Sequence, residues 1–274
     1  MMNRISYILT AALFALLSAL PTTATSAGCC AGTTGGDVNI DGVVDIADVF
    51  KLIDYLKDGT ALPVCSSVTD IDGNVYQTVT IGCQVWMAEN LKVTHYRNGD
   101  PIPNVTDGAT WATLTTGANC EYNNDVSNIG TYGRLYNWFA AVDSRNIAPA
   151  GWHVASDYEW KQLEMTLGMS QAQADATDLR STTEGGKLKD VGTTHWLSPN
   201  TGATNESGFT VLPGGYRNYN DGVYYNMHNS ATFWSSTDAN SYSAWARYLF
   251  NSSSGIYRGT NYKEHGFSVR CVRD

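Results

Sequence analysis

The pattern of apolar and polar positions is clearest near the middle of the chain, where it predicts a helix. Trp160, Leu163 and Leu167 recur at intervals that place them on one helical face. Ser156 stands at the N-cap position, and Glu159 follows three residues later, which is the spacing of a capping box. We expect this helix to be a core element around which the second part of the chain is organised.

The same stretch concentrates residues that are often catalytic. Asp157, Glu159 and Glu164 form a candidate acid/base set, and His153 precedes them. Helix capping and solvation of a helix surface account for the three acids without any chemistry. We therefore interpret the acids as surface or capping residues and His153 as a structural histidine.

Elsewhere the pattern predicts one more helix and many short strands. Leu135, Trp138, Phe139 and Val142 share one face of a helix over residues 132–142. A hairpin is predicted where strands over 68–71 and 75–79 flank the turn at 72–74. Further strands are predicted at 209–212, 222–226, 232–236, 244–250, 254–258 and 266–272. Two helices with a run of short antiparallel strands predict an α+β domain.

The first 27 residues have the pattern of an export signal. Arg4 supplies a positive start, residues 5–20 an apolar run, and residues 24–27 a small-residue cleavage region. The run is shorter than the roughly 20 residues that span a bilayer. We expect an exported protein that is extracellular or on a bacterial cell surface. Cys29 loosely matches a lipoprotein acylation site, so a lipid anchor is an alternative to free secretion.

Residues 37–48 have the spacing of a calcium-binding loop. Oxygen-bearing side chains occupy loop positions 1, 3, 5, 9 and 12, a backbone carbonyl is available at position 7, and Gly42 stands where a sharp turn is needed. The predicted Ca²⁺ ligands are Asp37, Asn39, Asp41, Val43 through its carbonyl, Asp45 and Asp48. An amphipathic helix follows, and Gly59 is placed to end it.

This loop and helix, within residues 28–59, resemble a single dockerin repeat, and residues 60–67 form a linker. The resemblance implies a cohesin-like protein partner and places Ile46 and Ala47 on the partner-facing surface. Dockerins usually carry two repeats and this chain has one, so a structural cap or spacer is the alternative role.

Composition narrows the classes of partner and cofactor. The formal net charge is −9, and the 17 Lys and Arg form no cluster, so no nucleic-acid surface is expected. Six cysteines in an exported chain favour disulfides, and Cys65 is a possible partner for Cys29 or Cys30. The sequence has no CxxC pair and no ligand spacing among its five His, so no zinc site is expected.

Several phrases in the second part of the chain resemble the Fibrobacter major paralogous domain (FISUMP). The resemblance covers residues 68–274 and is carried by residues 68–76, 85–91, 132–138, 151–160, 212–217, 233–237 and 266–272. The ending is similar to that of formylglycine-generating-enzyme domains, which implies a C-type-lectin-like fold. The family implies no established activity, and the reactive cysteine pair of that enzyme is not matched. We predict instead that Cys271 forms a disulfide with Cys83.

Candidate ligand contacts gather in one aromatic and amide-rich hairpin. Aromatic faces stack on sugar rings, while amide, carboxylate and guanidinium groups bond hydroxyls, although the same residues make ordinary cross-strand pairs. The candidates are Tyr216, Arg217, Tyr219, Asp221, Tyr224 and Tyr225. Asn205 and Glu206 are further candidates for oxygen ligands in a lectin-like loop.

These expectations favour an exported, non-catalytic binding module. Its ligand is expected to be an extracellular polysaccharide or a protein partner, and a calcium-stabilised dockerin-like unit precedes it. The alternative is a relative of carbohydrate-active or sulfatase-modifying enzymes. No nucleophile elbow, phosphate loop or dinucleotide fingerprint is present in the sequence.

Overall fold

The computed structural model describes residues 67–180 and 182–274, which belong to the second of two units into which the chain divides, Val64–Asp274. The export signal, the predicted calcium loop with its ligands, the partner-facing residues and nearly all of the linker lie outside the described residues. Each of those expectations stays a prediction.

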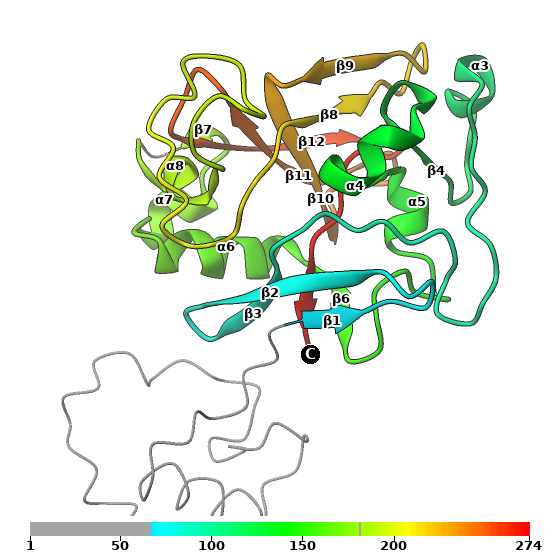
Figure 1. The fold of residues 1–274 in the computed structure, drawn as a ribbon, viewed down its shortest axis with the longest axis horizontal. Helices are drawn as coiled ribbons and strands as arrows, with labels where there is room; N and C mark the ends of the chain where they lie inside the picture. Colours follow the sequence, from blue (N-terminus) through cyan, green and yellow to red (C-terminus); the bar gives the residue numbers. More distant parts are fainter. Residues whose placement is uncertain (1–66, 181) are drawn as a thin grey trace, which may run out of the picture. The chain divides into compact units, whose positions relative to one another are not determined.

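Two sheets dominate the described part of the chain (Figure 1). The five-stranded sheet has the order β1 (Ser67–Thr69), β2 (Val75–Ile81), β3 (Gln84–Met87), β13 (Cys271–Arg273) and β6 (Trp152–Val154). The six-stranded sheet has the order β7 (Asp178–Arg180), β12 (Ile256–Tyr262), β11 (Ser243–Phe250), β10 (Ser230–Asp238), β8 (Gly214–Arg217) and β9 (Tyr224–Met227). A small third sheet pairs β4 (Asn119–Cys120) with β5 (Leu135–Tyr136).

The helices are short except for one. They are α3 (Gly108–Trp111), α4 (Ile129–Tyr132), α5 (Trp138–Ala141), α6 (Asp157–Thr166), α7 (Gln171–Asp175) and α8 (Glu184–Leu188), with 3₁₀ turns at Tyr122–Asn124 and Val126–Asn128. Figure 1 shows α6, α7 and α8 together at the β7 end of the six-stranded sheet. Nearly all strand pairs are antiparallel, with β10 and β8 as a parallel exception. The predicted α+β class is confirmed.

The predicted central helix is confirmed as α6. The Ser156 hydroxyl accepts from the Glu159 backbone N–H, and the Glu159 carboxylate accepts from the Ser156 N–H at 2.7 Å, which completes the capping box. Trp160, Leu163 and Leu167 are all buried. Because β3 and β13 meet this helix through Trp86 and Val272, α6 links the core of the five-stranded sheet to that of the six-stranded sheet.

The predicted helix over residues 132–142 is wrong, because three short elements take its place. Gly133 has a left-handed φ of 75° and packs so tightly that a Cβ there would lie 2.7 Å from the Cβ of Asn90. Leu135 and Tyr136 then pair with β4, and Asn137 caps α5 through its side chain. The helical spacing of apolar residues was real, but strand pairing across the chain outweighed it.

The strand predictions are mostly confirmed, with shifted bounds. The hairpin of β1 and β2, and the strands β9 to β12, correspond to the predicted segments. Residues 209–212 form only an isolated bridge between Val211 and Lys189, so the predicted strand there is wrong. The last predicted strand is shortened to β13 and preceded by bridges at Phe267 and Ser268. Among the described residues, no helix is long and apolar enough to cross a membrane.

Candidate functional site

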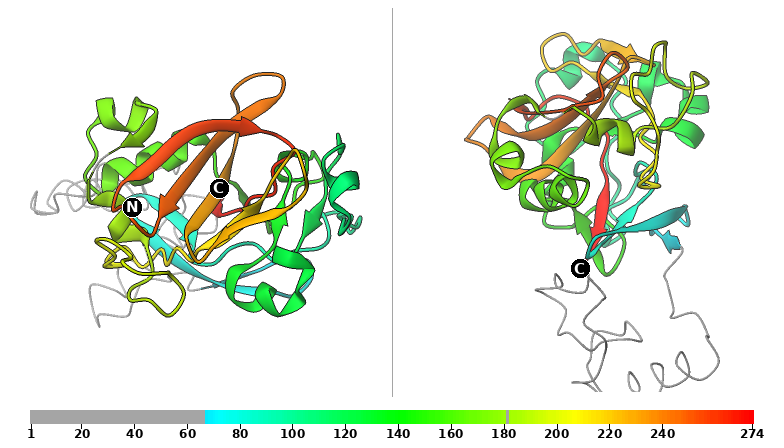
Figure 2. Two further views of the ribbon diagram at one scale, coloured as in Figure 1. Left: turned by 90° about the horizontal axis from the view of Figure 1, so that it is seen from above. Right: turned by 90° about the vertical axis from the view of Figure 1, so that its left-hand side faces the viewer.

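The six-stranded sheet has two faces of different character. On β11, Arg247 and Leu249 point toward the side where α6 packs, while Ala246 and Tyr248 point the other way. On β12, Arg258 pairs with Arg247 and Tyr257 pairs with Tyr248 in the strand register, so each face continues across both strands. Figure 2 shows β10, β11 and β12 running side by side through the molecule.

The face toward α6 carries a buried network of ion pairs. Glu164 is fully buried and accepts from Arg180 at 2.7 and 2.8 Å and from Arg247 at 2.6 Å. Asp157 accepts from Arg247 at 2.8 Å and from Arg258 at 2.7 and 2.9 Å. Two carboxylates from one helix thus hold three arginines from three neighbouring strands, which are β7, β11 and β12.

This network corrects the interpretation of the acids as solvated helix residues. Burial opposes the charged form of Asp157, but its bonds to Arg258 and Arg247 outweigh that effect and hold its pKa below the ordinary value. Asp157 and Glu164 are both bound to arginines beneath the helix, and neither is placed to exchange a proton with a ligand. Only Glu159 has the predicted capping role.

His153 lies in a structural arrangement, as predicted. Its Nε2 lies 2.6 Å from Glu159, and its Nδ1 contacts the carboxylate of Asp274. The hydrogen bond to Glu159 raises the pKa of His153 to about 9, although partial burial opposes the shift. The charged imidazole therefore ties β6 to the start of α6 and to the last residue of the sequence.

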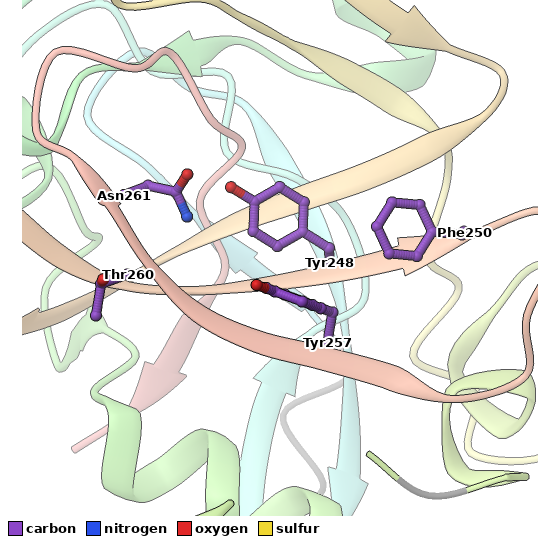
Figure 3. Close-up of a pocket in the computed structure, with 5 residues that line it drawn as sticks. All are labelled: Tyr248, Phe250, Tyr257, Thr260 and Asn261. Atoms are coloured by element: carbon purple, nitrogen blue, oxygen red, sulfur yellow. The ribbon is translucent and has the colours of Figure 1, made fainter. Parts of the chain in front are cut away.

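The opposite face of the sheet has a hollow. A space of about 240 Å³ is lined by Tyr248, Phe250, Tyr257, Thr260 and Asn261, all from β11 and β12 (Figure 3). None of these side chains is fully buried. The hollow combines aromatic walls with hydroxyl and amide groups, which is the usual lining of a small-molecule site.

The aromatic rings around the hollow are held in fixed orientations. The Tyr248 and Phe250 rings are nearly parallel, with 10° between their planes and 6.2 Å between centroids, while Tyr257 stands edge-on to Tyr248 at 5.5 Å. Figure 3 shows the Tyr248 hydroxyl directed toward the Asn261 amide. Burial raises the pKa of Tyr248, and burial together with a hydrogen bond to Asp178 raises that of Tyr257. Both hydroxyls therefore stay protonated as hydrogen-bond donors at neutral pH.

The predicted hairpin forms beside this face as β8 and β9. Tyr216 and Tyr225 are cross-strand neighbours, with centroids 5.8 Å apart, and Tyr225 donates to Asp221 at 2.9 Å. Tyr219 stacks on Tyr262 at the end of β12, at 4.4 Å. Tyr216, Tyr219, Tyr225 and Asp221 are at least partly exposed, and we call these four residues the hairpin patch.

The structure places two of the predicted ligand contacts, Arg217 and Tyr224, apart from the hairpin patch. Arg217 is fully buried and donates to the carbonyls of Val105, Thr106 and Gly222, while its guanidinium lies between the rings of Trp111 and Tyr224 at 4.5 and 4.9 Å. Alternation along β8 directs Arg217 to the side opposite Tyr216. Arg217 and Tyr224 therefore fasten the segment around α3 to the hairpin and do not belong to the hairpin patch.

The predicted oxygen ligands in the lectin-like loop are engaged within the protein. The Asn205 carbonyl oxygen accepts from the Thr210 N–H at 2.9 Å, and Glu206 forms an ion pair with Lys187 at 3.1 Å. Within the described residues, no group of three or more His, Cys, Asp or Glu side chains is placed to hold a metal ion.

The predicted disulfide between Cys83 and Cys271 does not form. Val272 pairs with Trp86, which puts Cys271 opposite Met87 and leaves Cys83 four residues away, in the turn before β3. That offset is about 13 Å at the usual strand rise, whereas bridged Cα atoms lie within about 7 Å. Cys271 is buried as a thiol, and burial raises its pKa.

Sequence reasoning did not name the hollow. Its three aromatic residues lie in the predicted strands 244–250 and 254–258, but Thr260 and Asn261 lie beyond the predicted end of the second strand. The alternation in residues 244–250 already placed Tyr248 and Phe250 on one face. What it did not provide was the strand pairing, which sets Tyr257 directly opposite Tyr248.

A comparison with protein-family models identifies the second part of the chain. The model of the Fibrobacter succinogenes major domain matches residues 79–273. The chain belongs to this family. The FISUMP resemblance is thereby confirmed, and the family domain includes both the hollow and the hairpin patch. No curated protein and no solved structure matches the chain.

Proposed function

We propose that the Fibrobacter succinogenes major domain of this chain is an exported, non-catalytic module that binds carbohydrate on the open face of its six-stranded sheet. The observation that carries this proposal is the hollow, which is lined by the aromatic side chains of Tyr248, Phe250 and Tyr257 and by the polar residues Thr260 and Asn261. Sugar rings have apolar faces and polar edges, so they match a site whose walls are aromatic and whose corners carry donors and acceptors.

The fixed orientation of the side chains adds support. The rings lie on adjacent strands of a sheet and contact one another, so little side-chain entropy is lost when a ligand binds. Asn261 offers both a donor and an acceptor, and the two tyrosine hydroxyls remain protonated. This combination favours a ligand with many hydroxyl groups over a purely apolar one.

The alternative, an enzyme, has less support among the described residues, because the carboxylates near the two faces of the sheet are already bound to other side chains. The buried acids Asp157 and Glu164 are bound to arginines on the other face of the sheet. The acids nearest the open face, Asp178 and Asp221, bind the hydroxyls of Tyr257 and Tyr225. A hydrolase screen beside the binding assays tests this alternative, and turnover abolished by replacing one carboxylate would refute the non-catalytic proposal.

The binding proposal is tested with the full chain and immobilised or soluble polysaccharides in affinity electrophoresis. We expect Tyr257→Ala to weaken retention by about tenfold, the effect of losing one well-packed aromatic contact. Tyr158→Ala is the matched control, because Tyr158 is 65% exposed on α6, away from the open face. Equal retention of both variants, or no retention by any neutral or acidic polysaccharide, would overturn the proposal.

A second proposal concerns the residues before the domain. The oxygen spacing from Asp37 to Asp48 supports a structural Ca²⁺ site in a dockerin-like unit, and the cohesin-like partner and the C-type-lectin-like fold also stay predictions. Titration calorimetry of the full chain should show calcium binding that Asp41→Ala abolishes. Heat of the same size from both proteins would argue against the loop as the site.

A further inference from the structure

We infer that the ligand of the open face is an uncharged polysaccharide chain that lies across the strands, from the hollow to the hairpin patch. This inference rests on the proposed carbohydrate binding and adds the length and the charge of the ligand. It is carried by the continuity of the aromatic rings, the size of the hollow and the charges at the two ends of the face.

The aromatic rings form one continuous path across the sheet. Tyr257 contacts Tyr248 at 5.5 Å, and Tyr248 contacts Phe267 at 5.7 Å. Phe267 contacts Tyr216 at 6.0 Å, and Tyr216 contacts Tyr225 at 5.8 Å. Phe267 is fully buried, so it connects the rings from beneath and does not itself meet a ligand, whereas the tyrosines on either side of it are partly exposed.

The path is longer than one sugar ring. In the sheet order, β12 and β9 are separated by β11, β10 and β8, which corresponds to about 19 Å at the usual strand spacing. The hollow alone has a volume of about 240 Å³, smaller than the roughly 300–1,000 Å³ of sites that enclose drug-sized ligands. A ligand that uses the whole path must therefore be a chain, with one unit in the hollow and later units over the hairpin patch.

The charges along the path exclude an acidic chain. Asp178 lies at the Tyr257 end and Asp221 at the Tyr225 end. Among the described residues, neither carboxylate forms an ion pair with a lysine or arginine, and Asp221 accepts from the Tyr225 hydroxyl at 2.9 Å.

Two cationic side chains, Arg217 on β8 and Lys263 just after β12, already have partners within the protein. Arg217 is buried against three carbonyls, and Lys263 pairs with Asp238 at 2.6 Å with its own side chain only 9% exposed. Carboxylated or sulfated sugars would thus meet two acids and no available cation, which is unfavourable. Neutral sugars carry no such penalty.

The test measures the affinity of the full chain for neutral oligosaccharides of increasing length. The probes are β-1,4-linked gluco-, xylo- and manno-oligosaccharides from one ring up to about six, a range over which added contacts raise affinity when they are linked in one ligand. Oligogalacturonates of the same lengths are the charged counterparts. We expect affinity for a neutral series to rise at least about tenfold with length, and oligogalacturonates to bind more weakly at every length.

Two variants separate the ends of the path. Tyr257→Ala should weaken binding of short and long chains alike, whereas Tyr225→Ala should weaken binding of long chains only. Tyr225→Phe keeps the ring and loses only the bond to Asp221, so it should retain long-chain binding and show that the loss in Tyr225→Ala is not a folding defect.

The outcomes distinguish this inference from the function it rests on. Affinity independent of length, with Tyr225→Ala unchanged, would leave carbohydrate binding in place and overturn the extended site. Tighter binding of oligogalacturonates would overturn the charge assignment. Failure of every oligosaccharide to bind would overturn both the inference and the proposed function.

Discussion

The two faces of the six-stranded sheet differ in chemistry although the same strands supply both. One carries buried ion pairs and the other carries partly exposed aromatic rings. On β11, Arg247 is fully buried beneath α6 and held by two carboxylates, whereas its neighbour Tyr248 faces a hollow on the other side. On β12, Arg258 and Tyr257 repeat the contrast. One face is closed by charge pairing. The other is covered by core residues at Ala244 and Ala246, and its aromatic rings at Tyr248 and Tyr257 are partly exposed.

The contrast teaches where stability and binding are located. A buried ion network must be complete, because any member left alone would carry an uncompensated charge away from water. A partly exposed aromatic ring has no such requirement. Its removal takes away only a few packing contacts and leaves no buried charge without a partner. We therefore expect substitutions on the closed face to affect folding and those on the open face to affect ligand binding.

The largest effect is expected from Glu164→Gln on the closed face. The change leaves Arg180 and Arg247 buried with one carboxylate fewer, and breaking such a pair costs about 3–5 kcal/mol. Chemical denaturation measures it. Asp175→Asn is a suitable control, because Asp175 is exposed and its bonds to Lys161 and Gln171 lie at the surface, so its replacement should cost far less than that of Glu164. Equal losses of unfolding free energy in Glu164→Gln and Asp175→Asn would show that the buried ion pairs are no more important for stability than a surface pair.

The next effect is expected from Arg217→Met, which tests whether this arginine is structural. Three carbonyls that now accept from its guanidinium would lose their donor, and we expect a loss of about 2–3 kcal/mol. The measurement is the free energy of unfolding, followed by polysaccharide affinity of the folded fraction. If the unfolding free energy stayed the same while polysaccharide affinity was lost, Arg217 would be a ligand contact after all.

A smaller effect is expected from His153→Gln on β6, beside the start of α6. Because the folded pKa of His153 is raised to about 9, its contribution is complete below the unfolded pKa of about 6.5 and is lost as pH rises through 9. The imidazole is partly exposed, so the contribution should be under about 1 kcal/mol.

The measurement for His153 is the difference in unfolding free energy between the two proteins as a function of pH. Comparing them cancels the titrating groups that do not contact His153, and Glu159, which does, titrates well below this pH range. The difference should shrink between about pH 6.5 and pH 9 and vanish above that range. A constant difference across the range would show that the histidine acts through packing alone.

The smallest effect on stability is expected from Tyr257→Ala on the open face. Its ring is partly exposed, and its removal leaves a wider hollow that water can fill, so we expect a loss of under about 1 kcal/mol. Thermal unfolding measures this loss of stability. The same variant should show the loss of polysaccharide retention described above. A loss as large as that of Glu164→Gln would mean that the open face belongs to the core.

Local patterns predicted what depends on near neighbours. The capping box of α6, its buried face and the turn between β1 and β2 all involve residues a few positions apart, and all are confirmed. The helix predicted over residues 132–142 failed because Leu135 and Tyr136 bond to partners far along the chain. The predictions for Asp157 and Glu164 were wrong for the same reason, since their arginines lie at least 16 residues away.

By itself, the sequence determined the α+β class, the central helix, most of the strands and the family to which the domain belongs. It also assembled the aromatic hairpin, because those residues are close together in the chain. Only the tertiary structure decided that Arg217 turns inward, that Asp157 and Glu164 are buried with arginine, and that Tyr248 and Tyr257 meet across a hollow. The physical reason is strand pairing: a shift of one residue exchanges the two faces of a strand, and the register is set by contacts between distant segments.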